Sequence, residues 1–141
     1  MKIDTTIDSI LDLESPLDLT FSGAVKSLVS EKEWTKEEKL AVRKRILEQA
    51  IPKHLGYLEK QIEDNGTGWL VGDGLTIADL KLYYVGGLMI QKGILDGIPA
   101  TTLDSYPKVK ENIEKVKSHP DVAAWYEKYP GGKYSTFDYA P

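Results

Sequence analysis

The feature that most constrains the fold is a capped helix start followed by an almost unbroken apolar run. Thr76 and Asp79 have the spacing of a capping box. In that motif the threonine oxygen accepts from the Asp79 N–H, and the aspartate carboxylate accepts from the Thr76 N–H. Leu75 and Leu80 add the spacing of a hydrophobic staple around the cap. We therefore expect a well-defined helix to begin at this point.

The residues after the cap are apolar on nearly every side of the expected helix, a pattern typical of a buried helix. They are Ile77, Ala78, Leu80, Leu82, Tyr83, Tyr84, Val85, Leu88, Met89 and Ile90. Asp79 and Lys81 interrupt the run, which falls short of the ~20 residues that a membrane span needs. Gly86 and Gly87 each cost about 1 kcal/mol of helix propensity, so a neighbouring helix should approach closely there. The pattern predicts a buried central helix.

The first segment, from Lys2 to about Leu28, has apolar residues at helical spacing. Pro16 lies inside this segment and is expected to kink or split the helix near Ser15.

An acidic ladder runs along the same segment, with Asp4, Asp8 and Asp12 at intervals of four residues. Like charges at this spacing are unfavourable, and the helix N-terminus offsets them only within the first turn. Asp12 is therefore either solvated or the ligand of a positively charged partner. A stripe on one helix supplies too few oxygen ligands for a divalent metal.

A second capping box, Thr35 with Glu38, opens a long amphipathic helix that runs to about Ile62. Pro52 in its interior predicts a kink. The basic residues Lys39, Arg43, Lys44 and Arg45 could suggest phosphate binding, but Glu37, Glu38 and Glu48 are interleaved with them. An ion-paired solvent face is the better interpretation.

Two shorter helices are expected near the C-terminus. One starts at Pro107, and the other starts after Ser118, which is the expected N-cap. No strand pattern is present, so the sequence predicts one all-α domain over residues 1–141: five or six helices around one buried central helix, with an irregular tail from about residue 130.

Composition excludes several classes of function. The net charge of -4 and pI near 5.2 argue against a nucleic-acid partner. The chain has no cysteine, which removes disulfides, thiolate metal sites and a cysteine nucleophile. His54 and His119 lie far apart, so no metal site is expected. The start has no signal-peptide pattern, and we expect a cytoplasmic protein without a membrane span.

The residues from Trp69 to Leu80, Trp-Leu-Val-Gly-Asp-Gly-Leu-Thr-Ile-Ala-Asp-Leu, resemble the signature of the C-terminal, all-helical domain of cytosolic glutathione transferases. The opening from Ile3 to Leu13 resembles the first helix of that domain in the pi, mu, alpha and sigma types. The resemblance covers nearly the whole chain. It implies a partner, the N-terminal thioredoxin-like domain of the family, which no segment of this chain matches.

The resemblance also implies site residues. Asp12 would contact the γ-glutamyl ammonium of glutathione bound to the other subunit of a homodimer. Asp18 and Ser22 would face the pocket for the hydrophobic electrophile, although both are polar and a surface role is equally open. Glutathione would be a co-substrate, and no cofactor is implied. The catalytic hydroxyl or thiol belongs to the thioredoxin-like domain, so we expect no catalytic residue in this chain and no activity from it alone.

Two functions remain open, beside a generic helical bundle in which the capping box is a coincidence. The first is the C-terminal domain of a detoxifying glutathione transferase, favoured by Asp12 and the opening segment. The second is a non-catalytic, transferase-like module that binds proteins in a larger assembly, favoured by the missing catalytic domain.

Overall fold

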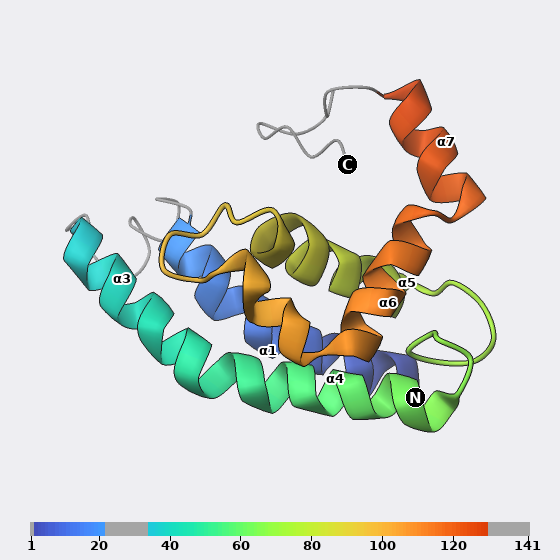
Figure 1. Ribbon diagram of the computed structural model, residues 1–141, viewed down its shortest axis with the longest axis horizontal. Helices are drawn as coiled ribbons and strands as arrows, with labels where there is room; N and C mark the ends of the chain where they lie inside the picture. The colour runs from blue at the N-terminus through green and yellow to red at the C-terminus, as the bar shows by residue number, and fades with distance from the viewer. Residues whose placement is uncertain (1, 22–33, 130–141) are drawn as a thin grey trace.

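The computed structural model describes residues 2–21 and 34–129, and within these ranges the chain contains helices and no strand (Figure 1). The elements are α1 (Lys2–Phe21), α3 (Lys36–Arg45), the π-helical segment η2 (Ile46–Ala50), α4 (Ile51–Asn65), α5 (Ile77–Leu82), the π-helical segment η3 (Tyr83–Gln91), the 3₁₀ helix η4 (Ala100–Ser105), α6 (Pro107–Lys117) and α7 (Pro120–Lys128). The predicted all-α class is confirmed.

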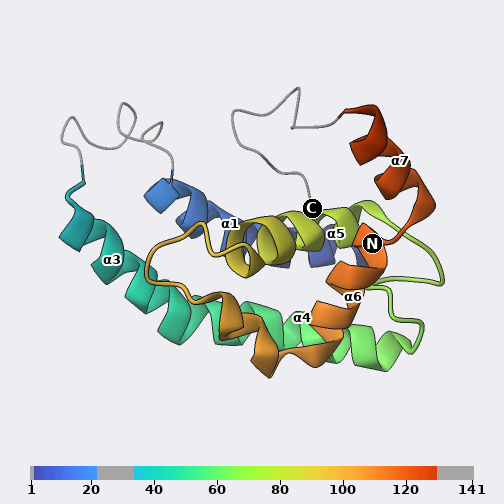
Figure 2. The same cartoon turned by 45° about the horizontal axis from the view of Figure 1, so that its top comes forward.

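The central helix consists of α5 and η3, which contact α1, α6 and η4 (Figures 1 and 2). Ala78, Leu82 and Val85 are completely buried on it, as the apolar pattern predicts. The start of α5 is the exception, because Ile77 and Leu80 remain 62% and 41% exposed. One side of the first turn of α5 therefore faces outward, while the rest of the helix forms the core.

The two adjacent glycines of η3 lie against Ile113 of α6. A Cβ added to Gly86 would lie 2.7 Å from Ile113 Cδ1, and one added to Gly87 would lie 3.1 Å from Ile113 Cγ2. A side chain at position 86 would require Ile113 to move, and one at position 87 would be tightly packed. The predicted close approach of a neighbouring helix is confirmed.

The segments α3, η2 and α4 form one long run along the bundle (Figure 1). Its N-terminus is the predicted capping box, in which the Thr35 N–H donates to Glu38 Oε2 at 2.8 Å. Just before Pro52 the helix widens into a π turn, where the Ile51 N–H donates to the carbonyl of Ile46. Proline lacks an N–H and crowds the preceding turn, which accounts for the π turn. The kink expected at Pro52 stays a prediction.

Helix α1 continues through Pro16, so the predicted split near Ser15 is wrong, while the kink expected there stays a prediction. Leu13 and Leu17 are completely buried on either side of the proline. Their packing holds the helix together although Pro16 cannot donate to the preceding turn. The expected end near residue 28 lies outside the described residues.

Helix α6 buries Val109, Ile113 and Val116 completely, as predicted. Helix α7 contacts α6, projects from the bundle (Figures 1 and 2) and buries none of its residues. The expected cap by Ser118 is wrong, because His119 Nδ1 accepts from the Asp121 N–H. None of the described helices combines the length and hydrophobicity needed to cross a bilayer. The predicted tail lies outside the described residues.

Candidate functional site

The Asp79 carboxylate joins three parts of the fold. Its Oδ2 atom accepts from the Thr76 N–H at 2.9 Å and from the Thr76 hydroxyl at 2.7 Å. Its Oδ1 atom accepts from the Leu70 N–H and from Asn112 Nδ2, each at 2.9 Å. The predicted capping box is confirmed, while the bonds to the preceding loop and to α6 were missed. Four donors offset the cost of burying this carboxylate completely.

Asp12 lies on the exposed side of α1 and forms no hydrogen bond or salt bridge with the residues that the structure describes. Its charge acts on His54, which is 8% exposed on α4. The Ser9 hydroxyl lies 3.2 Å from His54 Nδ1. The Asp12 carboxylate is therefore available to a cation from outside the chain.

His54 should make the domain less stable in mild acid. Burial lowers the pKa of His54, the charge of Lys53 lowers it further, and Asp12 opposes both. The folded pKa therefore lies below the usual value of about 6.5, and the unfolded state takes up the proton first. This contribution to stability is complete above about pH 6.5 and is lost as the pH falls through the lower folded pKa.

Urea unfolding between about pH 7.5 and pH 5.5 measures this effect. We expect His54→Gln to flatten the decline in stability. His119→Gln, which changes the other histidine, is the control. An unchanged slope in His54→Gln would contradict the assignment.

Asp18 is half-buried on α1 in a group of charges. One turn before it, Glu14 receives Lys81 Nζ on both carboxylate oxygens, at 2.7 Å to Oε1. The ammonium also lies 5.5 Å from the centre of the Tyr84 ring. Burial and the charge of Glu14 raise the pKa of Asp18, while Lys81 lowers it. Asp18 therefore lies next to the Glu14–Lys81 ion pair. Ser22 lies outside the described residues.

Sequence reasoning missed Glu14. It follows Ile10 by four residues and is itself 8% exposed. A carboxylate on the buried stripe of an amphipathic helix needs a buried cation, and Lys81 was the only basic residue within the central apolar run. Together these two positions could have indicated the pair.

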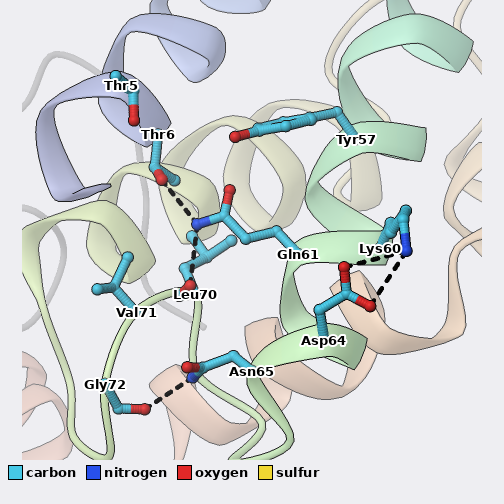
Figure 3. Close-up of a pocket in the computed structure, with 10 residues that line it drawn as sticks. All are labelled: Thr5, Thr6, Tyr57, Lys60, Gln61, Asp64, Asn65, Leu70, Val71 and Gly72. Atoms are coloured by element: carbon cyan, nitrogen blue, oxygen red, sulfur yellow. Dashed lines mark hydrogen bonds and ion pairs between the residues drawn. The ribbon is translucent and has the colours of Figure 1, made fainter. Parts of the chain in front are cut away.

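A pocket of about 680 Å³ lies between the start of α1, the end of α4 and the loop that follows (Figure 3). Its lining residues are Thr5, Thr6, Tyr57, Lys60, Gln61, Asp64, Asn65, Leu70, Val71 and Gly72. Gln61 Nε2 donates to Thr6 Oγ1 at 2.7 Å and to the Leu70 carbonyl at 2.9 Å. Gln61 Oε1 is buried without a partner among the described residues and lies on the side of Tyr57 (Figure 3). No sequence motif had indicated this pocket.

The pocket and Asp12 share one side of the domain. Thr5 and Asp12 are seven residues apart, which places them two turns apart on one face of α1. On α4, His54, Tyr57 and Gln61 follow one another at helical spacing. We call this surface the α1–α4 face, defined by these five residues. It contains a half-exposed tyrosine, together with a carboxylate and an amide oxygen that have no hydrogen-bond partner among the described residues. Among the described residues, no group of histidine and acidic side chains could hold a metal.

The fold defines the class of protein to which the chain belongs. The Nu-class GST from Haemonchus contortus superposes with a TM-score of 0.65 at 28% identity, over 94% of this chain and 57% of that one. The prostaglandin synthase D of Nilaparvata lugens has the same fold, with a TM-score of 0.70 at 23% identity over 92% of this chain and 56% of that one. The chain therefore covers little more than half of each of these two structures.

A family model described as "Glutathione S-transferase, C-terminal domain" matches residues 20–129. The chain belongs to this family. Curated relatives include the probable glutathione S-transferase 7 of Caenorhabditis elegans, 31% identical over 64% of this chain and 41% of the relative. The S-crystallin SL11 of Nototodarus sloanii is 28% identical over 90% of this chain and 55% of the relative. The chain spans about half the length of the relatives it matches.

Proposed function

We propose that this chain acts as the C-terminal domain of a dimeric glutathione transferase that conjugates glutathione to hydrophobic electrophiles. The observation that carries the proposal is the free Asp12 carboxylate on the exposed side of α1, in a chain of this family. The domain would supply part of the electrophile pocket, a glutathione contact and a share of the dimer interface. Glutathione would be the co-substrate, and no cofactor would take part.

The chemistry of Asp12 fits an ammonium ligand. Asp12 has no hydrogen bond or salt bridge to a described residue. Binding of the γ-glutamyl ammonium would therefore break no such contact. A charge-assisted hydrogen bond of this kind contributes about 1–3 kcal/mol when partly shielded. The second subunit of the dimer would shield this bond from solvent.

The α1–α4 face would border the second subunit, because Asp12 acts across the dimer in this proposal. Tyr57 is 49% exposed beside the 680 Å³ pocket. Gln61 Oε1 has no donor within the described part of the chain. Both features suit a surface that another protein covers.

The electrophile pocket would include Asp18 and Ser22. These positions follow from counting along the sequence from Asp12, as the resemblance to the family implies. The Glu14–Lys81 pair next to Asp18 would fix the position of this side of α1 against α5. Activation of the thiol needs a donor or a positive charge at the sulfur. That group would come from a thioredoxin-like domain, and the present chain would bind and orient the reactants.

The experiment replaces Asp12 by alanine in a protein that joins this domain to a thioredoxin-like domain. Glutathione affinity, measured by titration calorimetry, should fall about 5- to 150-fold, which corresponds to the loss of one charge-assisted contact. The KM for the electrophile should stay nearly unchanged. Asp8→Ala is the matched control, because it removes the same charge from an exposed position one turn earlier on α1. Equal glutathione affinity in the two variants would refute the contact.

The same protein separates the two candidate functions. We expect the joined protein to conjugate glutathione and the isolated chain to be inactive. A joined protein that folds, forms a dimer and binds no glutathione would favour the protein-interaction module instead.

A further inference from the structure

The basic residues of α3 do not form one ion-paired solvent face. Lys44 fits the expected pattern, because it is exposed and its Nζ atom lies 3.9 Å from the Glu48 carboxylate. Arg43, in contrast, is 7% exposed. It faces a cavity of about 340 Å³ at one end of the bundle. The end of α1, the start of α3 and the loop after η3 lie side by side there (Figures 1 and 2).

Neutral oxygens alone receive the hydrogen bonds that the Arg43 guanidinium makes within the described part of the chain. Nε donates to Thr20 Oγ1 and Nη2 to the Thr20 carbonyl, each at 3.0 Å. Nη1 donates to the Asp96 carbonyl at 3.1 Å. A guanidinium has five N–H donors, so two of them have no acceptor among the described residues. The Asp96 carboxylate acts on the Arg43 charge electrostatically but accepts none of these hydrogen bonds. A buried cation without a hydrogen-bonded anion is costly, so the two remaining N–H donors are available to an anion from outside the chain.

Two further positive charges line the cavity. Lys36 and Lys39 line it together with Arg43, at positions i, i+3 and i+7 of α3. Neither lysine forms a salt bridge with a described residue. Leu40 and Ile94 supply apolar wall, and Asp96 supplies the one opposing carboxylate among the described lining residues. This concentration of positive charge stands out in a chain whose net charge is -4.

We propose that the cavity between α1, α3 and the Asp96 loop binds a phosphomonoester group, held by Lys36, Lys39 and the free N–H donors of Arg43. A planar guanidinium and two ammonium groups match the charge and the oxygen geometry of a phosphate. The cavity volume leaves room for a small organic part beside the phosphate. The site lies at the far end of α1 from the pocket of Figure 3. It does not depend on glutathione binding.

The test measures binding of inorganic phosphate to the chain by titration calorimetry and by the shift in melting temperature. The cavity variant is Lys36→Gln with Lys39→Gln. The control is Lys44→Gln with Arg45→Gln, which removes the same two charges from exposed positions on the same helix. We expect the affinity to fall roughly tenfold or more in the cavity variant, and to stay within about twofold of the parent in the control.

Asp96→Asn tests whether the charges of the cavity, and not only its structure, determine the affinity for phosphate. The Arg43 bond to residue 96 goes to the backbone carbonyl and survives this substitution. Loss of the opposing carboxylate should tighten phosphate binding several-fold, because it removes a like-charge repulsion. Equal losses in the cavity and control variants, or weaker binding in Asp96→Asn, would overturn the proposal, as would the absence of saturable binding.

A second arm identifies the source of the phosphate. Vesicles of phosphatidylcholine with phosphatidic acid are compared with free inorganic phosphate on the same four proteins. Binding of free phosphate without vesicle binding assigns a small soluble phosphate compound. Vesicle binding that the cavity variant loses assigns a lipid headgroup.

Discussion

Asp79→Ala is expected to lower the free energy of unfolding by about 3–5 kcal/mol, more than any other single substitution proposed for this chain. The change removes the acceptor for the N–H groups of Leu70 and Thr76 and for the Asn112 amide. All three donors lie in or next to a site that is closed to solvent. Each buried donor left without a partner costs about 1–3 kcal/mol.

Glu38→Ala is the matched control, since Glu38 makes the same capping-box bond at the exposed start of α3. Water replaces the lost acceptor there, so the cost should stay below about 1 kcal/mol. Chemical unfolding of both variants gives the comparison. Similar losses in the two would show that burial and the links to Leu70 and Asn112 contribute nothing beyond the cap.

Gly86→Ala should destabilise the domain by about 1–2 kcal/mol, although alanine is the better helix former by about 1 kcal/mol. The added Cβ would lie 2.7 Å from Ile113 Cδ1, between two fully buried segments. The clash therefore outweighs the gain in propensity. Ile113→Val removes the clashing methyl group, and the double variant should recover at least about 1 kcal/mol relative to additivity.

Gly56→Ala is the control for this prediction. Gly56 lies inside α4, and nothing lies within 4 Å of a Cβ added there. Without a clash, the substitution should stabilise the chain by about 0.5–1 kcal/mol. If both alanine variants stabilise the protein by equal amounts, the close contact between η3 and α6 does not limit the residue at position 86.

The sequence predicted what depends on neighbours along the chain. Both capping boxes join residues three positions apart, and the central helix follows from its unbroken apolar pattern. The links from Asp79 to Leu70 and Asn112 span 9 and 33 residues, and no local pattern reports which distant donor will meet a buried carboxylate. The continuity of α1 through Pro16 has the same origin, because packing of Leu13 and Leu17 overrides the local preference.

Arg43 shows how a local pattern misleads. Interleaved acidic residues indicated a solvated face, yet Arg43 precedes the buried Ile46 by three residues and so lies on the inner stripe of its helix. That spacing was the available signal. The pocket of Figure 3 had none, since its walls come from three separate segments. The roles of Asp12, Asp18 and Ser22 stay predictions.

The most direct test of the central claim uses mixed dimers of the joined protein, in which one subunit's thioredoxin-like domain has been disabled for glutathione binding. Glutathione then binds only to the other subunit. Asp12→Ala in the disabled subunit should weaken glutathione binding about 5- to 150-fold, whereas Asp12→Ala in the binding subunit should leave the affinity unchanged. The reverse pattern, or equal affinity in both dimers, would contradict a contact that reaches from this domain to glutathione on the opposite subunit.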